Sequence, residues 1–150
     1  MGVSFAVITS AYGRQSQGTV RPHLLDLPVS QYGVDMADHT DDLRLAHILA
    51  DDADSLTMSR FGARDLTVST KPDHSEVTDA DLAVEDSVRR TLSRMRSRDA
   101  VHGEERADTG DGPRRWIIDP IDGTANFLRG VPVWATLIAL SVEDQIVASV

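Results

Sequence analysis

Residues 114 to 128 read RRWIIDPIDGTANFL, an apolar run that leads directly into a turn carrying two aspartates. Residues 116–118 have the composition of a buried β-strand, and the Asp-Pro and Asp-Gly pairs that follow are strong turn signals. The strand is therefore predicted to end at Asp119. Pro120 fixes its own φ and has no amide hydrogen, so the chain is expected to bend there while the carboxylates of Asp119 and Asp122 converge on one point.

The end of the same stretch predicts an anion site. Gly123 lets the backbone approach a ligand closely. The amides of Gly123 and Thr124 are expected at a helix N-terminus, where unpaired donors and the helix dipole hold anions. Carboxylate oxygens are the donors that magnesium prefers. This turn is therefore predicted to serve a magnesium ion and a phosphate ester together.

A second acidic motif lies upstream, where residues 101–105 read VHGEE. Alone, Glu104 and Glu105 are typical of a solvated acidic loop, and an isolated Asp-Pro or Asp-Gly pair is common in exposed turns. Together with the two aspartates they predict a cluster of carboxylates.

Other phosphatase chemistries fit the sequence poorly. The chain has no cysteine, which excludes a cysteine nucleophile. A phosphoaspartate enzyme of the haloacid dehalogenase type needs two aspartates two positions apart, whereas Asp119 and Asp122 are three apart. The sequence also contains neither a Gly-x-x-x-x-Gly-Lys-[Ser/Thr] phosphate loop nor a His-Glu-x-x-His zinc motif.

Composition predicts one globular domain. The 150 residues are 41% hydrophobic, enough for one core, and the net charge of −9 argues against nonspecific nucleic-acid binding. No apolar stretch approaches the roughly 20 residues that span a bilayer. Residues 1–35 have no basic leader and are predicted to form a poorly ordered extension before a domain over residues 36–150. We expect a cytoplasmic protein that binds neither nucleic acid nor membrane.

Two helices are predicted before the aspartate turn. The first runs from Thr40 or Asp41 to near Gly62 and has a core face of Leu45, Leu49, Ala53 and Leu56. A strand over residues 66–70 and a loop over residues 71–76 follow. The second helix opens at a capping box formed by Thr78 and Asp81, and its core face consists of Val84, Val88, Leu92 and Met95. Further strands are predicted at residues 100–102, 133–141 and 145–150, the last two as neighbours.

Taken together, these motifs resemble those of a known family. Residues 103–105 (GEE) and 116–127 (WIIDPIDGTANF) are similar to the signatures of the inositol monophosphatase-like, lithium-sensitive sugar phosphatases. Within that family, residues 129–140 (RGVPVWATLIAL) look most like the actinobacterial-type histidinol-phosphate phosphatases. The resemblance implies an α/β (α+β) fold, namely the N-terminal half of a layered αβαβα sandwich with helices packed on a mainly antiparallel sheet.

The resemblance also implies a set of metal ligands. Glu104, Asp119 and the main-chain carbonyl of Ile121 would hold one Mg²⁺, and Asp119 with Asp122 would hold a second, in a site of two or three ions. Lys71 would line the same metal and lithium region as a secondary member.

Catalytic and substrate-binding roles are implied for the same turn. Glu104 and Thr124 would orient and activate the attacking water. The phosphate would be bound by Ile121, Asp122, Gly123 and Thr124. Asp81 aligns with a residue of the metal region, although it fits an ordinary helix-start residue equally well.

The implied reaction is hydrolysis of a small phosphorylated metabolite, preferably histidinol phosphate to histidinol and phosphate in histidine biosynthesis. Inositol monophosphate is the alternative substrate. Family members are usually longer, and their C-terminal half supplies a further metal-binding aspartate, so a truncated and catalytically inactive fragment is a third reading. The apolar edge of the last strand predicts pairing with another chain, for instance as a homodimer.

Overall fold

The computed structural model describes residues 39–72 and 74–150. The predicted poorly ordered extension, residues 1–35, and the start of the domain at residue 36 lie outside the described residues. The elements follow one another in this order: α2 (Thr40–Arg60), β1 (Val68–Thr70), β2 (Glu76–Thr78), α3 (Asp79–Met95), β3 (Ala100–Gly103), β4 (Arg114–Asp122), α4 (Thr124–Leu128), β5 (Ala135–Val142) and β6 (Gln145–Ser149).

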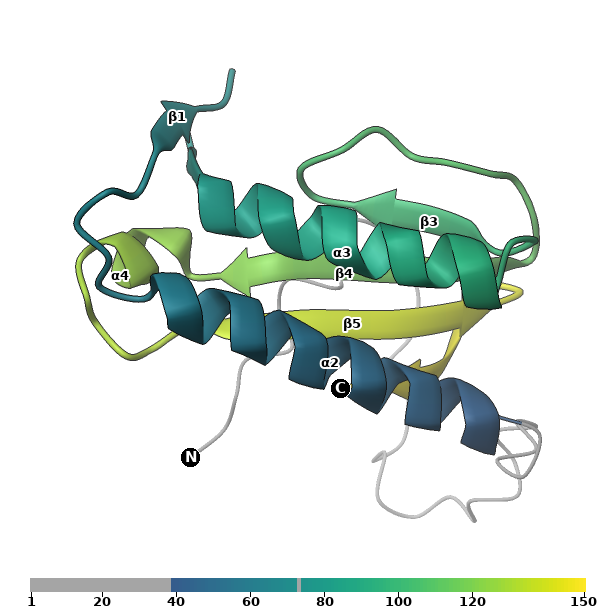
Figure 1. Ribbon diagram of the computed structural model, residues 1–150. Helices are drawn as coiled ribbons and strands as arrows, with labels where there is room; N and C mark the ends of the chain where they lie inside the picture. The colour runs from purple at the N-terminus through teal and green to yellow at the C-terminus, as the bar shows by residue number, and fades with distance from the viewer. Residues whose placement is uncertain (1–38, 73) are drawn as a thin grey trace, which may run out of the picture. The chain divides into compact units, whose positions relative to one another are not determined.

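A four-stranded sheet with the order β3-β4-β5-β6 forms one layer. Strands β3 and β4 are parallel, whereas β4 with β5 and β5 with β6 are antiparallel, which confirms the predicted mainly antiparallel sheet. Helices α2 and α3 lie side by side over one face, α2 in contact with β5 and α3 with β4 (Figure 1). None of the helices in the described ranges is both long and apolar enough to cross a lipid bilayer.

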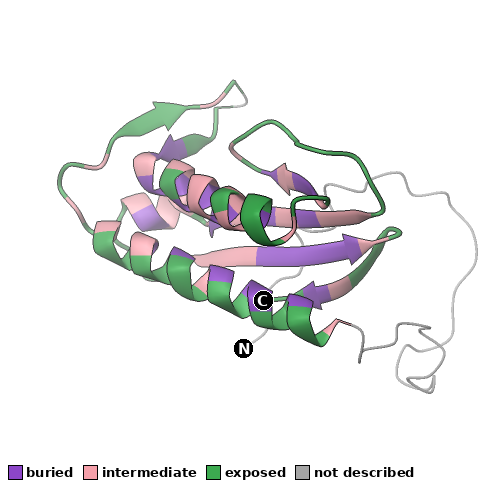
Figure 2. Cartoon of the chain, turned by 45° about the vertical axis from the view of Figure 1, so that its right-hand side comes forward, coloured by how far each residue is buried: buried purple, intermediate pink, exposed green. Residues whose placement is uncertain are grey.

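The core lies between the two helices and the sheet, and Figure 2 shows that the buried residues of α2 and α3 lie on the faces turned toward the strands. It consists mainly of Leu45, Leu49, Ala53, Val84, Val88, Leu92, Trp116, Ile118, Ile138 and Leu140. The expectation that Met95 belongs to this core is wrong. Met95 is 51% exposed because it is the last residue of α3, where the chain turns away.

The predicted end of the central strand at Asp119 is also wrong, because β4 continues to Asp122. Its register with β5 shifts between Asp119 and Asp122, and Pro120 lies within this irregularity. An irregular ladder tolerates proline where a regular central strand does not. The Thr136 hydroxyl donates to the Pro120 carbonyl at 2.8 Å, which supplies a cross-strand bond at the irregular point.

Two boundaries near β1 differ from prediction. The strand expected at residues 66–70 is shorter, and the expected loop ends in a second short strand, β2, which pairs antiparallel with β1. Every residue of β1 is exposed, so no pattern of alternating burial marked this hairpin in the sequence.

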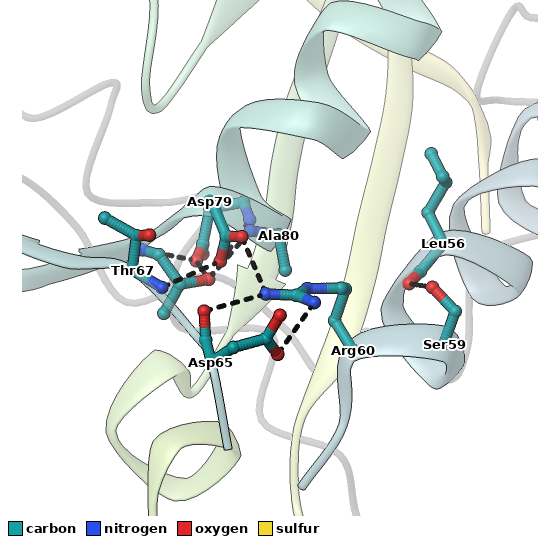
Figure 3. A network of polar contacts seen from close by, with 9 residues as sticks. Leu56, Ser59, Arg60, Asp65, Thr67, Asp79 and Ala80 are labelled. Atoms are coloured by element: carbon teal, nitrogen blue, oxygen red, sulfur yellow. Dashed lines mark hydrogen bonds and ion pairs between the residues drawn. The ribbon is translucent and has the colours of Figure 1, made fainter. Parts of the chain in front are cut away.

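The start of α3 is fixed by polar contacts on both sides. The predicted capping box of Thr78 and Asp81 is confirmed. Outside the helix, Arg60 donates to Asp79 Oδ2 at 2.8 Å and to Asp65 Oδ1 at 3.1 Å, as Figure 3 shows. These bonds tie the end of α2 and the following loop to the first turn of α3.

A buried carboxylate connects the other end of the helical layer to the sheet. Asp42 in α2 accepts from Arg96 Nε at 3.1 Å and from Arg114 Nη2 at 3.0 Å. Burial alone would raise the pKa of Asp42, but the hydrogen bonds of Arg114, His39 and Arg96 lower it. Asp42 is therefore a charged residue whose charge is matched within the fold.

Candidate functional site

The two acidic motifs meet at one edge of the sheet. Strands β3 and β4 are parallel, and Gly103 at the end of β3 pairs with Ile118 in β4. The Glu104 amide continues this pairing and donates to the Ile118 carbonyl at 3.2 Å. Because parallel strands end at the same edge, Glu104 lies beside Asp119, the next residue of β4.

Asp119 is the least satisfied carboxylate in the described part of the chain. Its Oδ1 is buried and has no hydrogen-bond partner among the described residues. Burial raises the pKa of Asp119 to about 8, with further contributions from the charge and hydrogen bond of Glu104 and from the charges of Asp122 and Asp81. The structure therefore brings Glu104, Asp119, Asp122 and Asp81 close enough to disfavour one another's charge.

A lysine ammonium lies against this cluster. Lys71 Nζ is 2.7 Å from Glu104 Oε1 and 2.7 Å from Glu105 Oε1. Burial would lower the pKa of Lys71, but the hydrogen bonds and charges of Glu104 and Glu105 raise it. Burial also raises the pKa of Glu105, which the Lys71 hydrogen bond opposes. Lys71 thus neutralises part of the acidic cluster.

The donor set fits a hard divalent cation in chemistry, although the side chains do not enclose one as they stand. In the described part of the chain no group of three His, Asp or Glu side chains has the geometry of a metal site. Glu104 Oε1 is instead bound to Lys71. The buried free oxygen of Asp119 and its raised pKa are features that a bound cation would relieve, and every nearby donor is an oxygen.

Thr124 is held at the start of α4. Its hydroxyl lies 3.0 Å from the Ile121 carbonyl and 3.3 Å from Asp81 Oδ1. Asp81 is 1% exposed and also accepts from the Thr78 amide at 2.8 Å. Burial raises the pKa of Asp81, and the hydrogen bonds of Thr78 and Thr124 oppose that rise. Asp81 is therefore a helix-start residue that also contacts the candidate catalytic threonine.

Gly123 has two structural reasons to be glycine. It is the N-cap of α4 with a φ of 88°, in the left-handed region. A Cβ at this position would also lie 3.2 Å from the Val133 carbonyl oxygen. The turn after β4 therefore has a fixed backbone, while the expected contacts of the Gly123 and Thr124 amides with phosphate stay a prediction.

Sequence reasoning missed Glu85. This residue of α3 is fully buried, and its carboxylate accepts a hydrogen bond from the Glu105 amide at 2.7 Å. The signal that could have found it is its place on the core face of the helix, one position after Val84, where an acid is rarely buried without a partner. Arg89, one turn further along α3, is a local partner, whereas the Glu105 amide lies 20 residues away and no local pattern indicates that contact.

Comparison with known proteins identifies the family of this fold. The profile of the inositol monophosphatase family matches residues 39–150. A histidinol-phosphatase of Streptomyces coelicolor is 66% identical over 105 residues, which are 70% of this chain and 40% of that protein. The histidinol-phosphatase of Mycobacterium tuberculosis is 62% identical over 107 residues, 71% of this chain and 41% of that protein.

A solved structure agrees with the fold. The crystal structure of the extragenic suppressor protein SuhB from Bartonella henselae matches with a TM-score of 0.68 and 32% identity, over 71% of this chain and 43% of that chain. The present chain thus spans about two fifths of the length of the relatives that it matches. On the extent of the profile match and the level of identity, the chain belongs to the inositol monophosphatase family.

Proposed function

We propose that this chain carries part of the active site of a magnesium-dependent phosphomonoesterase that acts through metal-activated water. The observation that supports it is the buried, unpartnered oxygen of Asp119 within a cluster of carboxylates. The preferred substrate is histidinol phosphate, because the relatives with 66% and 62% identity are named histidinol-phosphatases. The chain covers about 40% of each, so activity and substrate belong to the proposal.

In this proposal Glu104, Asp119 and the main-chain carbonyl of Ile121 hold one Mg²⁺, and Asp119 with Asp122 holds a second. Bound magnesium supplies polarisation of the phosphoryl group and a lowered pKa for a bound water. Glu104 gives up part of its ion pair with Lys71 when it becomes a ligand. Asp119 then remains ionised at neutral pH, since its unpaired oxygen gains a partner.

Thr124 and Glu104 orient the attacking water, and the backbone of the turn binds the phosphate. The Thr124 hydroxyl is suited to this role because Asp81 and the Ile121 carbonyl hold its oxygen in place. Asp81 can accept the hydroxyl proton in a hydrogen bond, which leaves the lone pairs of Thr124 for water. The amides of Gly123 and Thr124 donate to phosphate oxygens at the start of α4.

A second candidate substrate is inositol monophosphate, which is favoured by the family profile over residues 39–150. Charge favours histidinol phosphate instead, because its amine is cationic and the chain has a net charge of −9. The proposal includes a small phosphorylated metabolite as the partner, a cytoplasmic location and a homodimer.

Phosphate release by the full 150-residue chain tests the proposal. The chain is incubated with histidinol phosphate and, separately, with inositol monophosphate, each with and without magnesium. We expect magnesium-dependent release that is faster with histidinol phosphate and is abolished in Asp122→Asn. Phosphate release that does not need magnesium would contradict the mechanism. If the folded chain releases no phosphate at all, the result would favour an inactive fragment.

A further inference from the structure

Glu85 is a buried acid that anchors the backbone of the acidic turn 103–105. It is fully buried on α3, and each of its oxygens accepts one hydrogen bond. Arg89 Nε donates to Oε1 at 2.7 Å, and the Glu105 backbone amide donates to Oε2 at 2.7 Å. Hydrogen bonds to an ionised acceptor are stronger than neutral ones, so this is a firm attachment between α3 and the turn.

The glycine of the turn provides the space for this attachment. A Cβ built on Gly103 would lie 2.0 Å from Glu85 Oε1 and 2.4 Å from its carboxyl carbon. Gly103 does not have a left-handed φ, unlike Gly123, so its backbone conformation does not require glycine. The carboxylate of Glu85 therefore occupies the place that a side chain at position 103 would fill.

Two consecutive amides of the turn are fixed by different elements. The Glu104 amide donates to Ile118 in β4 at 3.2 Å, and the Glu105 amide donates to Glu85 in α3. Glu104 thus lies between two anchored peptide units; its side chain contacts Lys71, and its backbone pairs with Ile118, the residue before Asp119. Without Glu85, the Glu105 amide would lose its partner in a largely buried position, and the peptide that carries Glu104 would be held from one side only.

We propose that Glu85 is a positioning residue: by anchoring turn 103–105 it holds the Glu104 carboxylate next to Asp119 and thereby sets the affinity of the site for a divalent cation. This inference rests on the magnesium role proposed above. Groups that orient a metal ligand typically contribute about 10- to 100-fold to metal affinity. Glu85 acts through Glu104 and is not itself a ligand in this proposal.

The test measures binding of Mn²⁺ to the full chain by electron paramagnetic resonance, which counts the free ion without any turnover. Glu85→Gln keeps the size of the side chain, but an amide has one acceptor oxygen, so its NH₂ group faces one of the two donors. We expect a Kd for Mn²⁺ that is about 10- to 100-fold higher than in the unmodified chain. Asp41→Asn, which removes one charge from the first turn of α2, is the control and should leave the Kd almost unchanged, because the ion pair of Asp41 with Arg44 is exposed.

A compensating pair separates positioning from stability. Gly103→Ala alone should lower the free energy of unfolding because its Cβ overlaps Glu85. In Gly103→Ala with Glu85→Ala the overlap is relieved, so part of the stability that Gly103→Ala loses in urea unfolding should return, while the affinity for Mn²⁺ stays at least about 10-fold weaker. A stable double variant that binds Mn²⁺ like the unmodified chain would overturn the inference.

The outcomes distinguish this inference from the proposed function. Equal Mn²⁺ affinity in the unmodified chain and in Glu85→Gln overturns the role of Glu85 alone. If the folded, unmodified chain binds no Mn²⁺, the metal site itself is refuted, and the role of Glu85 with it. Weaker Mn²⁺ binding in Glu85→Gln, together with unchanged Mn²⁺ binding in Asp41→Asn, supports both the metal site and the role of Glu85.

Discussion

Replacement of Asp119 by asparagine should stabilise the metal-free chain at alkaline pH and remove its response to magnesium. The carboxyl group has a pKa of about 8 in the fold, against about 3.9 in an unfolded chain. Between these values the folded state binds a proton that the unfolded state does not. Stability therefore falls as the pH rises toward about 8, since folding then requires either proton uptake or a buried charge.

The size of the effect follows from the shift. One proton changes the free energy of unfolding by at most about 1.4 kcal/mol per pH unit, and this slope declines as the pH approaches the folded pKa. Between about pH 6 and about pH 8 the contribution of Asp119 to the free energy of unfolding should therefore fall by about 2 kcal/mol. Screening by water at this partly exposed residue makes the fall smaller. Asp119→Asn cannot titrate, so the difference between the two proteins isolates this amount from all other groups.

Urea unfolding followed by tryptophan fluorescence measures both proteins across this pH range. The stability advantage of Asp119→Asn should grow by about 2 kcal/mol from about pH 6 to about pH 8. Added Mg²⁺ should then stabilise the unmodified chain, by about 2.7 kcal/mol at 100 times its Kd, and the variant much less. A difference that stays constant with pH would refute the reasoning, because Asp119 would then have an ordinary pKa in the fold.

Three further substitutions test other parts of the structure. Asp42→Ala should lower the free energy of unfolding by about 2 to 4 kcal/mol, because it leaves two arginines without their shared partner. The control Asp41→Ala, at an exposed position, should change the free energy of unfolding little. Equal effects of the two substitutions in urea unfolding would contradict the role of Asp42. Thr124→Val should slow phosphate release by about 100-fold or more and leave the affinity for Mn²⁺ unchanged. Thr124→Ser, which keeps the hydroxyl, should retain most of the rate. A weaker affinity for Mn²⁺ in the valine variant would instead place Thr124 among the metal ligands. Gly123→Ala should cost about 1 to 3 kcal/mol in thermal unfolding because of its positive φ, and an unchanged Tm would show that the turn adapts.

Local chemistry was sufficient to predict most of the fold. The capping box at Thr78 and the apolar spacing of the two helices each depend on residues within one or two turns, and both predictions are confirmed except at Met95. The strand that ends in Asp119 was predicted too short because proline usually terminates regular pairing. The extension to Asp122 depends on a shift in register with β5, which only the partner strand determines.

The candidate site likewise contains features that the local sequence predicts and contacts that it does not. The turn and the helix start at Gly123 and Thr124 were predicted from their own residues, and α4 begins at Thr124 with Gly123 as its N-cap. Contacts between distant segments had no local signal: Lys71 reaches Glu104 across 33 residues, and Glu85 reaches the Glu105 amide across 20. These contacts depend on where the segment between β1 and β2, helix α3 and the turn after β3 lie in the fold, so they follow from the tertiary structure and not from any motif.

The acids in the interior of this chain differ in which groups balance their charge, and that difference supports the proposed cation site at Asp119. Asp42 has two arginines, and Glu85 has an arginine and a backbone amide, so both charges are matched within the fold. The charges that raise the pKa of Asp119 come from other carboxylates, and one of its oxygens is buried without a partner among the described residues. A buried charge that lacks a partner is strongly unfavourable, so Asp119 must either hold a proton or bind a cation from solution. The charges of Glu104 and Asp122 both raise the pKa of Asp119, so a divalent cation would offset the repulsion among all three carboxylates, whereas a proton on Asp119 offsets it for one.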